Sequence, residues 1–88
     1  MGHFIGGSAY MMARDVAEGY ILLNDPMLRK FIRSEVQQVL FELDKLIREA
    51  RGEAVDQEDV PAIQRKNRRV SRINAAVSIL KSRLAKRF

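Results

Sequence analysis

The chain has 88 residues, no cysteine and a single histidine, and its formal net charge is +5. This length corresponds to one small domain with a modest core, and the lack of cysteine excludes disulfides and thiolate metal sites. The positive balance favours anionic partners, and no apolar run reaches the roughly 18 residues that a membrane-spanning helix needs.

The N-terminal part of the chain is predicted to be a flexible leader followed by a helix. Residues 1–7 contain a glycine pair and no periodic pattern. A helix is predicted over residues 8–23, because apolar side chains recur there at helical spacing and Ser8 is suited to cap the first turn. Gly19 weakens this helix, and residues 20–23 taken alone also suit a short strand.

A second helix is predicted over residues 26–51. Asp25 is expected to cap it, with Pro26 as the first helical residue, where a missing N–H costs nothing. Ser34 and Gln37 form a second start signal, a capping box. The helix therefore either runs through Ser34 or kinks there. Its later part carries an apolar stripe typical of a helix packed against a neighbour.

A polar loop and a third helix complete the chain. Gly52 is expected to end the second helix in the left-handed conformation. Asp59 or a neighbouring residue is expected to cap a helix over residues 61–86, which Pro61 opens. This last helix carries apolar residues at the alternating 3-4 spacing of a coiled-coil seam, namely Val70, Ile73, Val77, Leu80 and Leu84.

Together these elements predict one all-α domain over residues 8–88, an antiparallel, coiled-coil-like helical hairpin with an additional N-terminal helix. Some apolar residues lie off the predicted seam and would stay exposed in a bare hairpin. They are Phe41, Ala75, Ala76 and Ile79. Either the N-terminal helix covers them, which gives a three-helix bundle, or a second protomer does, which gives a dimeric bundle.

Charge is divided unevenly between the two arms. Residues 60–88 contain nine basic side chains and no acidic one, whereas residues 34–59 contain eight acidic and three basic. Antiparallel arms are therefore expected to attract each other through ion pairs across the seam. The expected pairs are Glu49 with Arg65, and Glu42 with Arg69 or Arg72.

The tail of the last helix is expected to meet the turn after Pro26. This meeting would gather seven positive charges at one end of the hairpin, the basic end, with no acid nearby in the sequence, so a counter-charge from a partner is expected there. The seven residues are Arg29, Lys30, Arg33, Lys81, Arg83, Lys86 and Arg87. The candidate residues for contact with an anion or nucleic acid are Arg29, Lys30, Arg33, Arg68, Arg83, Lys86 and Arg87.

No catalytic, cofactor or metal-binding pattern is present in the sequence. His3, the single histidine, lies in the leader, and the acidic loop lacks the glycine and the spacing of a calcium loop. We therefore expect no enzyme, no cofactor and no small-molecule substrate. An anionic membrane surface is disfavoured, because the predicted exposed face has no broad apolar side.

The sequence predicts a cytoplasmic helical module for protein interaction or oligomerisation, with a homodimer favoured. Its strongly basic end would dock an acidic partner. The alternative is a nucleic-acid-binding hairpin that contacts duplex DNA or folded RNA through backbone phosphates. The few aromatic residues are not interleaved with the arginines, so stacking on single strands is not expected.

Overall fold

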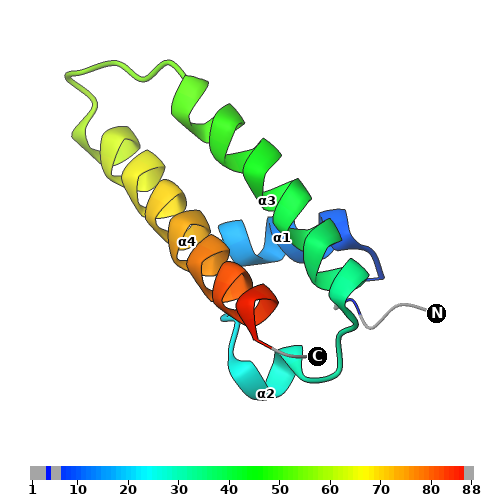
Figure 1. The fold of residues 1–88 in the computed structure, drawn as a ribbon. Helices are drawn as coiled ribbons and strands as arrows, with labels where there is room; N and C mark the ends of the chain where they lie inside the picture. The colour runs from blue at the N-terminus through cyan, green and yellow to red at the C-terminus, as the bar shows by residue number, and fades with distance from the viewer. Residues whose placement is uncertain (1–3, 5–6, 87–88) are drawn as a thin grey trace.

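The computed structural model describes residues 4 and 7–86, and within them the chain forms four helices and no strand. In order these are α1 (Ala9–Ala17), α2 (Asp25–Leu28), α3 (Arg33–Gly52) and α4 (Val60–Ala85). Figure 1 shows α3 and α4 as the antiparallel arms of a hairpin, and α1 packs against both arms. The predicted all-α class, with a hairpin and an N-terminal helix, is confirmed.

The core lies where α1 meets the hairpin. Its largest fully buried side chains come from all four helices and include Met12, Leu28, Leu43, Ile73 and Leu80. The apolar stripe of α3 is buried as predicted. The seam of α4 is buried at Ile73 and Leu80 and half-buried at its other three positions. One cluster of apolar side chains therefore joins all four elements.

The first helix ends at Ala17 and not near Leu23 as predicted. Gly19 adopts a left-handed φ of +86°, and its N–H donates to the carbonyl of Val16 at 3.1 Å. The next N–H, of Tyr20, donates to the carbonyl of Asp15 at 2.8 Å. This pair of bonds is a Schellman motif, which closes a helix at glycine. Residues 20–23 then follow without regular secondary structure.

The predicted helix over 26–51 is two helices, because the chain leaves the helical conformation after Leu28 and resumes it at Arg33. Asn24, rather than Asp25, caps α2, and its Oδ1 accepts a hydrogen bond from the Met27 N–H at 2.9 Å.

The start of α3 also differs from the prediction of a capping box at Ser34 and Gln37. The N-cap is Ile32, whose N–H donates to Oε1 of Glu35 at 3.0 Å. Glu35 is the buried acidic residue of the described core, at 6% exposed. Since Ile32 has no polar side chain, only the glutamate half of a capping box marks this helix start.

The remaining helix ends include one correction. Gly52 is the last helical residue of α3 and is not left-handed; the chain leaves the helix in an extended conformation at Glu53. Asp59 caps α4 as predicted, because its Oδ1 accepts from the Ala62 N–H at 3.1 Å. Of the expected leader, only Phe4 and Gly7 lie within the described residues. The Phe4 ring packs edge-on against Phe31, with centroids 5.8 Å apart.

No helix formed by the described residues is both long and apolar enough to cross a membrane.

Candidate functional site

Basic side chains hold the C-terminal ends of the three longer helices. Arg72 donates from Nε to the carbonyl of Ala17 at the end of α1, at 2.8 Å. Lys66 donates from Nζ to the carbonyls of Arg51 and Glu53 at the end of α3, at 3.3 and 2.8 Å. Arg33 donates from its guanidinium to the carbonyl of Leu84 at the end of α4, at 3.2 Å.

We call these contacts the helix-end latches. The last carbonyls of a helix have no partner within it and carry partial negative charge, so a cation there is favourable. In each latch the donor belongs to a different element from the helix that it closes. Part of the positive charge of the chain therefore stabilises its own fold.

The ion pairs predicted between the hairpin arms do not form. Glu42 pairs with Lys45 within α3, at 3.4 Å, and Arg69 pairs with Glu18 at the end of α1. Arg69 turns to Glu18 because α1 packs against α4, which sequence spacing alone does not reveal. Glu49 and Arg65 form no ion pair with any residue that the structure describes, and the basic residue that reaches the end of α3 is Lys66.

The tail of α4 meets the turn at α2 as predicted, but the expectation that no acid lies there is wrong. Asp25 pairs with Lys86 at 3.7 Å and with Arg29 at 3.6 Å. Arg33 is engaged in a helix-end latch, and Arg83 also has a partner within the protein. Arg87 lies outside the described residues. Most of the candidate anion contacts at this end are therefore already occupied.

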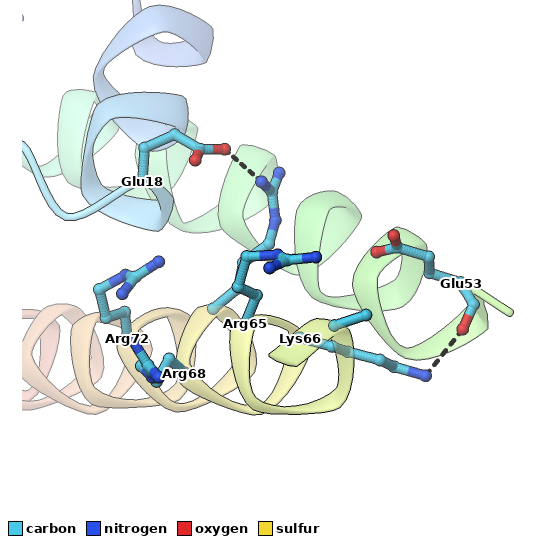
Figure 2. Close-up of a pocket in the computed structure, with 8 residues that line it drawn as sticks. Glu18, Glu53, Arg65, Lys66, Arg68 and Arg72 are labelled. Atoms are coloured by element: carbon cyan, nitrogen blue, oxygen red, sulfur yellow. Dashed lines mark hydrogen bonds and ion pairs between the residues drawn. The ribbon is translucent and has the colours of Figure 1, made fainter. Parts of the chain in front are cut away.

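A basic cleft of about 310 Å³ opens instead between the end of α1, the end of α3 and the first half of α4 (Figure 2). It is lined by Glu18, Glu53, Ala62, Arg65, Lys66, Arg68, Arg69 and Arg72. Three of its cations have the internal partners described above. Arg65 and Arg68 are exposed and make no hydrogen bond or ion pair with the described part of the chain.

Of these residues, only Arg68 belongs to the predicted anion contacts. Arg65, Arg69 and Arg72 were interpreted from the sequence as one half of salt bridges to α3. The sequence does contain a signal for this basic pair: the spacing of Arg65 and Arg68 places them one turn apart on the same side of a helix.

An apolar hollow of about 150 Å³ lies beside the basic cleft, and Arg72 lines both. Its other walls come from the end of α1, the segment after it and the middle of α4, namely Val16, Gly19, Ile21, Leu22, Leu23, Ala75, Ala76 and Ile79. At its edge, Leu22 is 83% exposed and the neighbouring Tyr20 is 81% exposed. We call this surface, formed by the exposed Tyr20, Leu22 and Ala75 and the half-buried Ile79, the apolar face.

The predicted helix-partner residues are divided by the fold. Ala76 is buried within the single chain, Ile79 is half-buried, and Ala75 is exposed. Phe41 lies apart from them, 59% exposed, in a shallow surface depression that shares no lining residue with the hollow. The Lys45 ammonium sits 5.1 Å from the centre of its ring.

No group of His, Cys, Asp or Glu side chains in the described part of the chain is arranged to hold a metal ion. Comparison of the chain with family models, with curated proteins and with solved structures finds no match. The basic cleft and the apolar face are the two candidate functional surfaces of the described residues.

Proposed function

We propose that this protein is a small non-enzymatic interaction module that self-associates through the apolar face, with a dimer as the favoured assembly. The observation that carries the proposal is the exposure of Tyr20 and Leu22, at 81% and 83%, beside an apolar hollow. Contiguous exposed apolar surface commonly marks an interaction site. Small chains without disulfides also often gain stability by oligomerisation.

A second copy suits this surface because a protruding group and a hollow lie side by side on it. In a two-fold symmetric pair, each subunit presents the same surface to the other. Tyr20 of one subunit would then reach the hollow of its partner, and the partner's Tyr20 would reach the first hollow. Such reciprocal packing removes both side chains from water, which is the main driving force of association.

The test is the mass in solution, measured by light scattering on the wild type and on Leu22→Asp. We expect a dimer for the wild type and a monomer for the variant, because a carboxylate would be buried without a partner. Leu22 is 83% exposed, so the variant should still fold, which circular dichroism checks. Ile79→Asp should act in the same direction.

Phe41→Asp is the matched control, because it places the same charge on an exposed residue away from the hollow. Its mass should equal that of the wild type. A monomeric wild type, or a Leu22→Asp protein that remains a dimer, would refute the proposed self-association. If Phe41→Asp were the only variant to lose the dimer, the interface would instead lie on α3.

The basic end keeps two exposed cations for docking an acidic partner, Lys30 and Lys81, which have no ion pair with a described residue. The cytoplasm is the compartment that we propose, since a cysteine-free chain suits a reducing environment.

Nucleic-acid binding is the second candidate, and the basic cleft is the observation that favours it. Phosphate contacts need only lysine or arginine within reach, and each releases counterions, so binding weakens as salt rises. A mixed-sequence duplex should therefore bind at about 50 mM salt and be released at about 200 mM. Binding that ignores salt over this range would exclude the candidate.

A further inference from the structure

We propose that the basic cleft is a binding site for a phosphate group, held by Arg65 and Arg68. This site is independent of self-association. If the phosphate belongs to a nucleic acid, the proposal rests on the nucleic-acid candidate above and assigns the contact to this pair of residues. If the phosphate belongs to a small ester, the proposal does not depend on that candidate. The proposal moves the anion site away from the basic end, where Arg29 and Lys86 pair with Asp25 and Arg33 is engaged in a latch.

The walls of the cleft are held in place without a ligand. Arg69 is paired with Glu18, Lys66 is bonded to the end of α3, and Arg72 is bonded to the end of α1. Figure 2 shows Glu18 facing α4 across the cleft and Lys66 reaching Glu53. A preformed site loses less conformational freedom on binding, which favours affinity.

Arg65 and Arg68 are the two cations of the cleft that have no partner among the described residues. They are spaced three residues apart on α4, so their side chains are neighbours on the helix surface. Two like charges at this spacing destabilise a helix slightly when no anion is present. A phosphate relieves this repulsion, and its oxygens match the fork of N–H donors that a guanidinium presents.

The lining of the cleft decides which part of a ligand it recognises. It contains five basic and two acidic side chains and no aromatic one. Its charge favours an anion, and one of the acids, Glu18, is already neutralised by Arg69. Without an aromatic surface for stacking, the cleft would contact the phosphate and not a base. The phosphate comes either from a nucleic-acid backbone or from a small phosphate ester.

The test titrates inorganic phosphate, and separately a short mixed-sequence DNA duplex, into the protein, followed by amide chemical shifts and calorimetry. The double variant Arg65→Gln/Arg68→Gln should bind phosphate at least tenfold more weakly. For the duplex, the slope of log affinity against log salt should fall by about 2, one for each lost contact. Both residues are exposed, so the fold should be retained.

The matched control is Arg14→Gln/Arg48→Gln, which removes the same charge from exposed arginines outside the cleft. It should bind phosphate as the wild type does. A wild type that binds neither ligand overturns the proposal, and so does an equal loss in the control, which would indicate net charge alone. Binding that Arg65→Gln/Arg68→Gln retains also overturns it.

The titrations with inorganic phosphate and with the duplex distinguish the two possible sources of the phosphate group. Phosphate binding without duplex binding assigns the site to a small phosphate ester, whereas duplex binding that depends on the two arginines assigns it to nucleic acid. Light scattering on the same double variant should give the same mass as the wild type. Failure of the phosphate site is thus distinguishable from failure of self-association.

Discussion

Arg72 of α4 donates a hydrogen bond from Nε to the carbonyl oxygen of Ala17, the last residue of α1, at 2.8 Å. The two residues are 55 positions apart, so this bond ties the N-terminal helix to the hairpin. The side chain of Arg72 also lines both the basic cleft and the apolar hollow. One arginine therefore closes a helix and forms the boundary between the two candidate surfaces.

Replacement of Arg72 by alanine should destabilise the protein by about 1–2 kcal/mol, because a part-buried charged donor to the end of α1 is lost. Urea unfolding measures this change. Arg68→Ala is the control, since Arg68 bonds to no described residue, and its effect should stay within about 0.5 kcal/mol. Equal losses in the two variants would show that the bond of Arg72 contributes nothing specific.

Gly19→Ala should lower the free energy of unfolding by about 1 kcal/mol, because the left-handed φ of +86° is unfavourable for a residue with a Cβ. The added Cβ would also lie 3.4 Å from Cδ of Arg72. Gly52→Ala is the matched control, because Gly52 is helical and has nothing within 4 Å of the new Cβ. Thermal unfolding should show Gly52→Ala to be neutral or slightly stabilising. A stabilising Gly19→Ala would argue against the Schellman motif.

Glu35→Ala should cost about 1 kcal/mol of stability, because the N–H of Ile32 at the start of α3 loses its acceptor. Gln37→Ala, at the position that the sequence pattern favoured, should change stability by less than about 0.5 kcal/mol, since Gln37 is exposed. Denaturant unfolding of the two variants compares the start signals directly. A larger loss of stability in Gln37→Ala than in Glu35→Ala would instead support a capping box formed by Ser34 and Gln37.

Asp25→Asn should change stability by less than about 0.5 kcal/mol, although Asp25 pairs with two cations. All three side chains are well exposed, and water screens such pairs. Its neighbour provides the contrast: Asn24→Ala should cost about 1 kcal/mol, because it removes the N-cap of α2. If Asp25→Asn proved the more harmful of the two in calorimetric unfolding, the ion pairs would hold the basic end together more strongly than their exposure indicates.

The two long helices could be predicted because their apolar residues recur with helical period over many turns. The cap at Asp59 could be predicted because Pro61 follows it closely. The start of α3 could not, since Ile32 has no capping side chain and the nearby Ser34 and Gln37 match the usual pattern better. Gly19 was recognised as unfavourable within a helix, but its role as the residue that closes α1 depends on the fold.

The candidate site was harder to predict than the helices. The run of arginines after Pro61 is plain in the sequence, yet the partner of each arginine depends on where α1 lies. Glu18 is 51 residues from Arg69 and carries no local sign of that contact. The same placement of α1 buries Ala76 and leaves Phe41 outside the apolar face. Sequence periodicity reports one helix at a time, so it could not assign these neighbours.

The helix-end latches have a consequence for how the molecule opens. The last turn of a helix usually frays, and its amide protons exchange with solvent through small local openings. Here the last turns of α1, α3 and α4 are each bonded to a side chain from another element. Fraying at any of these ends therefore also loosens a contact between elements. Slow hydrogen exchange at the three ends, approaching that of the core, is the expected signature of such cooperative opening.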